Sequence, residues 1–118
     1  MGTFSVTLEV GNPQGQRFRA VEAMVDTGAS YTMLPASLLR DLGVAPHGKR
    51  PFLLATGDTV VRDIGRKWVR IDGRTEMTIV VFGDEGGPLL LGAVTLEELG
   101  LGVDPVGRKL VPVPGLLT

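Results

Sequence analysis

A chain of 118 residues, 43% of them hydrophobic, is long enough for one domain with a modest core and too short for two. The formal net charge is −1 and Lys and Arg form no cluster, which argues against nucleic-acid binding, because that activity needs a basic surface. Without Cys, neither a disulfide nor a thiolate metal site is possible, and the single His47 excludes a His-based metal cluster. We therefore expect no metal and no cofactor.

The sequence has no apolar run of the roughly 20 residues that a membrane helix needs. Residues 1–5 also lack the charged-then-apolar pattern of a secretion signal. These features predict a soluble, cytoplasmic protein with no membrane partner. A fragment processed from a longer chain would show the same features.

Seventeen glycines and eight prolines separate short segments rich in Val, Thr, Leu and Ile, which is typical of a protein built from many short strands. The apolar alternation and the turn residues predict these elements in chain order: strands 3–10, 16–25 and 31–34, a helix 36–42, a hairpin 52–61 with its tip near residues 57–58, strands 60–71 and 75–82, a helix from about residue 95, and a strand 109–113.

Turn and cap signals set the expected boundaries. Residues 46–51 are rich in Gly and Pro and predict a loop, Gly65 is a candidate break in the long strand, and Asp72-Gly73 predicts a two-residue hairpin turn. Thr95 with Glu98 three residues later fits a capping box and predicts a helix start near Thr95.

The ends of the two predicted helices are similar in sequence. Residues 39–44 and 96–101 each combine a short helix with Leu-Gly and an aliphatic residue, although two capped helices can share this plan by chance. Pro112 and Pro114 place the last strand at a sheet edge or an interface, because proline cannot donate a backbone hydrogen bond.

The stretch 24–30 is the most informative part of the sequence. Asp26 follows a strand-like run directly and precedes a row of small residues, which predicts a carboxylate held on a tight loop inside a groove. Asp, Thr and Gly also favour ordinary Asx-type turns, and the tripeptide alone would favour that interpretation.

With its two leading apolar residues, the stretch reads apolar-apolar-Asp-Thr-Gly-Ala-Ser, and it resembles the active-site motif of aspartic proteases, most closely the retroviral type with one motif per chain. The resemblance implies that Asp26 is the catalytic carboxylate, that Thr27 turns its hydroxyl into the loop network, and that Gly28 permits close approach of backbone and substrate. Ala29 and Ser30 complete this active-site loop.

The order of elements is similar to the retroviral-type family over essentially the whole chain. The resemblance implies an all-β fold with one or two short helices, a closed retropepsin-like acid-protease barrel, and one half-site per chain in a single domain over residues 1–118. Residues Ala55, Thr56, Gly57 and Asp58 lie where the family has its substrate-covering flap. Leu90, Leu91 and Gly92 match the segment that threads behind the catalytic loop in that family.

Two differences from the viral enzymes place the chain nearer to their bacterial and cellular relatives. Ala93 stands where the viral enzymes have a charged residue, typically arginine, that supports the dimer. The predicted flap has one glycine, whereas viral flaps are rich in glycine.

Aspartic-protease chemistry requires two carboxylates, one to take a proton from water and one to hold the scissile carbonyl. Only Asp26 lies in the motif, and the other six aspartates adjoin turns, strand ends or a helix end, where we expect them to be solvated. The second carboxylate would then come from another copy of the chain. The resemblance thus implies a homodimeric endopeptidase acting on peptides or proteins.

Two other interpretations stay open at this point. One is a catalytically silent peptide-binding or assembly module on the same fold. The other is a small structural β-barrel with an accidental motif, which would leave Leu90, Leu91 and Gly92 unexplained.

Overall fold

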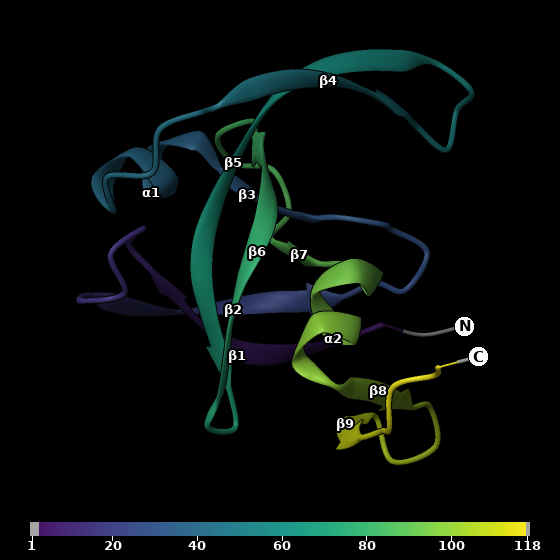
Figure 1. Cartoon of the computed structure of the whole chain (residues 1–118). Coiled ribbons are helices and arrows are strands. Elements are labelled where there is room, and N and C mark those ends of the chain that lie inside the picture. Colours follow the sequence, from purple (N-terminus) through teal and green to yellow (C-terminus); the bar gives the residue numbers. More distant parts are fainter. Residues whose placement is uncertain (1–2, 118) are drawn as a thin grey trace.

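The computed structural model describes residues 3–117, and Figure 1 shows a protein made mainly of strands. Within these residues there are nine strands and two short helices. They are β1 Phe4–Gly11, β2 Phe18–Val25, β3 Thr32–Pro35, α1 Ala36–Asp41, β4 Gly48–Leu53, β5 Thr59–Ile71, β6 Arg74–Gly83, β7 Leu90–Leu91, α2 Ala93–Leu99, β8 Leu101–Asp104 and β9 Lys109–Pro112.

Six strands form a closed ring of backbone pairings. The main sheet has the order β1-β2-β7-β3-β6-β5-β4, and β1 also pairs with β5. This last pairing joins the sheet to itself and leaves β4 outside the ring on the edge of β5. Strands β8 and β9 form a separate antiparallel pair. The predicted all-β class and ring closure are both present.

The ring encloses one apolar core, because alternate residues of each strand point inward. On β1, Leu8 and Val10 are buried, and Phe4 and Val6 of the same face pack partly buried against them. The buried members of the core come from the strands, both helices and the turn after α1: Leu8, Val10, Ala23, Val25, Leu34, Leu39, Leu42, Val44, Val69, Ile71, Val80, Phe82, Leu91, Leu96, Leu99 and Leu101.

The two halves of the ring repeat one arrangement. Strand β2 is followed by β3 and α1, and β6 is followed by β7 and α2. Each short strand lies beside the long strand of the other half, since β7 pairs parallel with β2 and β3 pairs parallel with β6. The short strands β3 and β7 pair antiparallel with each other. The similar sequences of the two helix ends therefore occupy equivalent places in the fold.

The predicted hairpin turn at Asp72-Gly73 is present, and both residues have positive φ (51° and 78°), as a two-residue turn of this type requires. Other boundaries were wrong. Residues 48–51, predicted as loop, belong to β4, which pairs with β5 over its whole length. As an edge strand it tolerates Pro51. Gly65 does not break β5, because β6 pairs with β5 without interruption from Ile64 to Ile71, with Gly65 opposite Val80.

The capping-box prediction was also wrong. Helix α2 begins at Ala93, its N-cap is Gly92, and no side chain caps it. Thr95 lies inside the helix and is buried, with its hydroxyl bound to other threonines. The pattern failed because Thr95 and Glu98 have tertiary partners, which were not visible from the local sequence. Gly100 does end α2, in the left-handed conformation.

Candidate active site

The Asp26 loop, residues 26–30, begins where β2 ends. Asp26 is half-buried, and its N–H donates to the carbonyl of Leu91 at 3.1 Å. The carbonyl of Asp26 accepts from Ala29 N–H at 3.1 Å, and the carboxylate oxygen Oδ1 accepts from Gly28 N–H at 3.0 Å. The loop is therefore an Asx-type turn that fixes the direction of the carboxylate, so the two interpretations of this stretch describe one geometry.

Leu90, Leu91 and Gly92 lie directly behind this loop. Strand β7 pairs Leu91 with Val25, the residue before Asp26. The first amides of α2 then bind the loop from the same side: Ala93 N–H donates to the Ala29 carbonyl at 2.9 Å, and Val94 N–H donates to the Ser30 carbonyl at 2.9 Å. The structure thus brings the two predicted motifs into contact through the backbone.

Gly92 stands where the two motifs approach most closely. A Cβ at this position would lie 2.5 Å from the carbonyl carbon and 2.6 Å from the carbonyl oxygen of Tyr31. Because both are backbone atoms, they cannot move aside without displacing the chain next to the Asp26 loop. Glycine is the residue that fits here.

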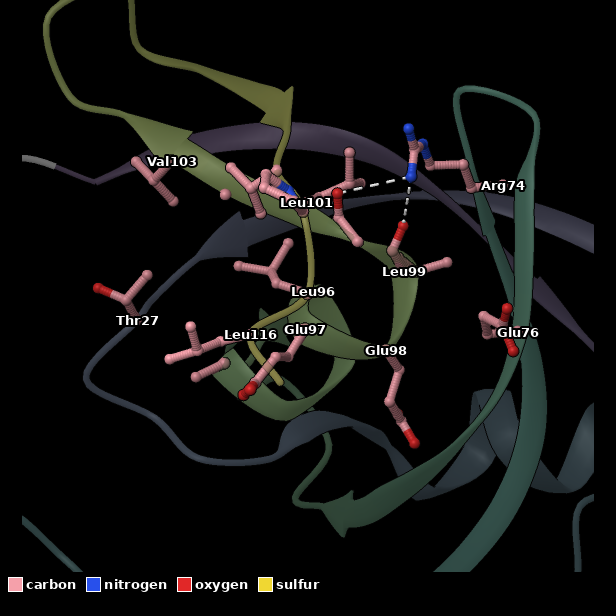
Figure 2. Close-up of a pocket in the computed structure, with 16 residues that line it drawn as sticks. Thr27, Arg74, Glu76, Leu96, Glu97, Glu98, Leu99, Leu101, Val103 and Leu116 are labelled. Atoms are coloured by element: carbon pink, nitrogen blue, oxygen red, sulfur yellow. Dashed lines mark hydrogen bonds between the residues drawn. The ribbon is translucent and has the colours of Figure 1, made fainter. Parts of the chain in front are cut away.

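Thr27 does not match its prediction within one chain. Thr27 is exposed, and its hydroxyl makes no hydrogen bond to the part of the chain that the structure describes. Thr27 instead lies at the wall of an outer cavity of about 480 Å³ formed with α2, β8 and the C-terminal segment. Figure 2 shows this cavity with Thr27 and Leu116 on its walls. The two dashed lines there mark Arg74 donating to the carbonyls of Leu99 and Gly100 at the end of α2.

The predicted flap residues Ala55, Thr56, Gly57 and Asp58 form the exposed tip of the β4–β5 hairpin. Leu54 N–H donates to the Asp58 carbonyl at 2.8 Å, and Gly57 has a φ of +92°. In Figure 1 this hairpin extends away from the ring as a long arm. The walls of the cavity beside residues 28–30 include Leu53 and Leu54, next to the tip, but none of the four tip residues.

A groove cavity of about 560 Å³ lies between the Asp26 loop and the half of the β4–β5 hairpin next to its tip. Sequence reasoning missed most of its walls, which come from four segments: Tyr31, Met33, Pro51, Phe52, Leu53, Leu54, Val60, Arg62, Val81, Asp84, Gly87, Pro88 and Leu90. The walls are mainly apolar, and the two charged members form a bidentate ion pair, with Arg62 donating to both oxygens of Asp84 at 2.9 and 3.0 Å. No local signal joins these segments, because the sheet pairing alone brings them together.

Asp26 itself lines a second cavity, of about 590 Å³, between β1, the Asp26 loop and the β8–β9 turn. Arg108 lines it and donates to the carbonyl of Thr3 at 2.8 Å. Among residues 3–117, Asp26 is the only carboxylate that lines this cavity. One chain therefore presents one carboxylate in an open setting.

The other six aspartates are less uniformly solvated than predicted. Four are exposed, but Asp63 and Asp104 are half-buried. Asp63 accepts a hydrogen bond from Lys49 at 2.7 Å, and Asp104 accepts from the amides of Val106 and Gly107. These partners hold the two carboxylates in structural roles.

A buried polar cluster lies beneath the loop support. Thr32, Thr78 and Thr95 are enclosed and bind one another through their hydroxyls. Lys67 of β5 is also completely buried, and its Nζ has no hydrogen-bond partner within residues 3–117. Burial lowers the pKa of Lys67 from 10.5 to about 7, and the negative charge of Glu98 partly opposes this. Sequence reasoning missed this cluster, since lysine is normally an exposed residue.

Residues 3–117 contain no group of three or more His, Cys, Asp or Glu side chains placed to hold a metal ion. Over the same residues, neither helix has the length and apolar character to cross a membrane.

Comparisons with known proteins agree with this geometry. A model of the aspartyl protease family matches residues 6–95, which include the Asp26 loop, the β4–β5 hairpin and the start of α2. No curated protein matches the chain. The fold is similar to the solution structure of the simian foamy virus (mac) protease, with a TM-score of 0.56 and 19% identity, covering 79% of this chain and 91% of that one.

The fold is also similar to the crystal structure of a retropepsin-like aspartic protease from Rickettsia conorii, with a TM-score of 0.54 and 23% identity, covering 87% of this chain and 88% of that one. These likenesses confirm the predicted retropepsin-like fold. The β8–β9 pair lies beyond the residues that the family model matches.

Proposed function

Because this chain belongs to the aspartyl protease family, we propose that it is an endopeptidase whose active site is completed by a second copy of the same chain. Each subunit of the homodimer supplies one Asp26. The observation that carries the proposal is the Asp26 loop itself, an intact Asp-Thr-Gly turn that holds one half-buried carboxylate at the wall of one cavity, while residues 28–30 of the loop line the groove cavity.

The chemistry follows from two carboxylates placed close together. They cannot both be ionised cheaply, so they share one proton, and aspartic proteases are the standard example of such a pair. The ionised carboxylate takes a proton from water as the water oxygen attacks the peptide carbonyl carbon, and the protonated one donates its hydrogen to the carbonyl oxygen. When the tetrahedral intermediate collapses, the C–N bond breaks, the carboxyl group that took the water proton gives it to the nitrogen, and the other carboxylate takes a proton from the hydroxyl that becomes the new carbonyl. The pair titrates as a unit.

The need for a second copy rests on what one chain lacks. The groove cavity is lined by one aspartate, Asp84, and Arg62 already binds both of its oxygens. A two-fold axis beside Asp26 would bring both Asp26 loops together in an isologous interface. Thr27, whose hydroxyl has no partner among residues 3–117, would then lie at that interface.

The C-terminal segment extends the same surface. Leu116 is 91% exposed and Val113 is 41% exposed, and both line the outer cavity next to Thr27. Exposed apolar side chains next to an incomplete site are what an interface between copies would cover. With Ala93 in place of a charged residue, this surface lacks one support that the viral dimers have.

The substrate would be an extended peptide in the groove cavity, bound like an added strand under the β4–β5 hairpin. The apolar walls favour hydrophobic side chains next to the cleaved bond. Tyr31 and Phe52 pack edge to face, with ring centroids 5.8 Å apart, and so join the Asp26 loop side of the groove to the hairpin side.

The test is hydrolysis of a peptide library by wild type and by Asp26→Asn. The amide has nearly the shape of the carboxylate, so the variant should fold and dimerise but lose hydrolysis. Asp72→Asn is the matched control, because Asp72 lies in a distant exposed turn with positive φ that Asn also accepts. Hydrolysis by purified Asp26→Asn would refute the proposal. Binding of a statine-type peptide by wild type without any turnover would favour the silent peptide-binding module.

A further inference from the structure

A chain of hydrogen bonds runs from the support of the Asp26 loop to the surface of α2. Gly92 N–H donates to the hydroxyl of Thr32 at 3.1 Å. The Thr32 and Thr95 hydroxyls are 2.7 Å apart, and those of Thr95 and Thr78 are 2.9 Å apart. The Thr78 hydroxyl donates to Oε1 of Glu98 at 2.7 Å. We call these five residues the threonine relay.

The direction of every bond in the threonine relay follows from how many hydrogens each group has. A hydroxyl has one hydrogen to donate, and a carboxylate can only accept. Thr78 uses its hydrogen on Glu98, so Thr95 must donate to Thr78. By the same step Thr32 donates to Thr95, and its oxygen is left to accept the N–H of Gly92. The relay is therefore a one-way chain that ends on a negative charge.

Because the threonine relay is buried, each of its hydroxyls depends on its partner within the relay. Thr32 and Thr78 are 0% exposed and Thr95 is 1% exposed, so a hydroxyl that loses its partner cannot turn to solvent. Bonds in such a chain polarise one another, and an unpaired buried polar group is costly. Removing the Glu98 acceptor at one end should therefore weaken the hydrogen bond of the Gly92 amide at the other end.

Gly92 is the point where the threonine relay meets the candidate active site. The preceding residue, Leu91, accepts the N–H of Asp26, and the following residue, Ala93, donates to Ala29. The backbone of Tyr31 leaves no room beside Gly92. The position of the segment around Gly92 thus determines the position of the Asp26 loop.

The surroundings of Glu98 support a specific role. Glu98 lines the outer cavity on α2, where Arg74 and Glu76 also lie (Figure 2). Lys67 lies on the inner side of Glu98, and it pairs with Thr78 between β5 and β6. Lys67 donates to no relay member, and the charge of Glu98 acts on it through space.

We propose that Glu98 is a positioning residue of the active site: as the terminal acceptor of the threonine relay, it fixes the Gly92 segment and through it the Asp26 loop. This role rests on the proposed function, since it is the Asp26 carboxylate that the loop presents. Glu98 itself takes no part in the chemistry. It lies on the outer surface of α2, and it acts through four hydrogen bonds.

Paired substitutions at Thr78 and Glu98 distinguish an effect of the relay hydrogen bonds from an effect of side-chain packing. Thr78→Val keeps the shape of threonine but removes the hydroxyl, whereas Thr78→Ser keeps the hydroxyl. Glu98→Leu removes the acceptor, whereas Glu98→Gln keeps an acceptor oxygen. Thr75, exposed on the same strand as Thr78, provides control variants to Val and Ser.

Two measurements are made on each variant. The first is kcat and KM for a peptide that wild type cleaves, and the second is the hydrogen exchange rate of the Gly92 amide, followed by NMR. We expect Thr78→Val and Glu98→Leu to lower kcat about tenfold with KM changed less than about twofold, and to speed Gly92 exchange about tenfold, as loss of one buried hydrogen bond implies. Thr78→Ser, Glu98→Gln and both Thr75 variants should stay near wild type.

The outcomes separate this inference from the proposed function. Equal behaviour of Thr78→Val and Thr78→Ser in both measurements would overturn the relay, even in an active protease. If wild type cleaved no peptide, but Gly92 exchange still rose in Thr78→Val and not in Thr78→Ser, the proposed function would fail and the positioning of the loop by Glu98 would stand. Normal kcat with fast Gly92 exchange would overturn the catalytic importance of the relay.

Discussion

Lys67 should make the fold less stable than an apolar residue would, and by an amount that depends on pH. In the unfolded chain the Lys67 amine is protonated up to its ordinary pKa of 10.5, whereas in the folded protein burial lowers that pKa to about 7. Between these two values the unfolded state binds one more proton, so the contribution of Lys67 becomes less unfavourable as pH rises. Below pH 7 the full cost is present, because the folded protein must then hold a buried ammonium.

The magnitude follows from the two pKa values. A difference of roughly 3.5 in pKa, at about 1.36 kcal/mol for each pKa unit, gives at most about 5 kcal/mol. Met has a similar length and no charge, so Lys67→Met should raise the free energy of unfolding by up to about 5 kcal/mol at pH 6. The gain should fall steadily between pH 7 and pH 10.

Urea unfolding at fixed protein concentration, from pH 6 to pH 10, measures this directly. Lys109→Met is the control, since Lys109 is exposed and should change stability by no more than about 0.5 kcal/mol at any pH. A Lys67→Met protein that is less stable than wild type would refute the reasoning. A gain that stayed constant from pH 7 to pH 10 would do the same, because it would not come from the buried charge.

Three further predictions concern the backbone. Gly92→Ala should lower the free energy of unfolding by about 2 kcal/mol or more, because its Cβ would overlap Tyr31, whereas Gly48→Ala, in open space, should have little effect on urea unfolding. Gly57→Val should lower kcat/KM about tenfold, because a β-branched residue is strained at the φ of +92° found there, although no atom lies within 4 Å of the new Cβ. Gly48→Val is its control, and an equal kcat/KM for the two would show that the hairpin tip is not a flap. Truncation after Pro105 removes β9, the strand that pairs with β8, and should abolish both activity and the dimer in sedimentation; full activity would place the interface elsewhere.

Local signals in the sequence predicted the parts of the fold that depend on local geometry. Asp72-Gly73 forms its turn because few other residue pairs accept two positive φ angles. That turn needs only a short stretch of chain to be specified. The pairing of the Asp26 loop with Leu91-Gly92 joins distant segments and was implied by the resemblance to the retroviral-type family, and the structure places the two in direct backbone contact.

The features that the sequence did not predict depend on contacts between distant segments. Residues 48–51 look like a loop, but pairing with β5 makes them a strand. Thr95 looks like a helix cap, but Thr32 and Thr78 bind it inside the core. Lys67 falls on the inward face of β5 by alternation, a position that its charge would normally exclude. In each case a tertiary partner decides against the local preference.

The central claim is that one active site contains Asp26 from two chains, and mixing wild type with Asp26→Asn tests it most directly. The proteins are equilibrated together until subunits exchange, at constant total concentration, and peptide hydrolysis is measured against the fraction of wild type. If each site needs both carboxylates, activity should fall as the square of that fraction, to about one quarter in an equal mixture. Activity that falls in direct proportion, to about one half, would mean that each chain works alone and would contradict the account.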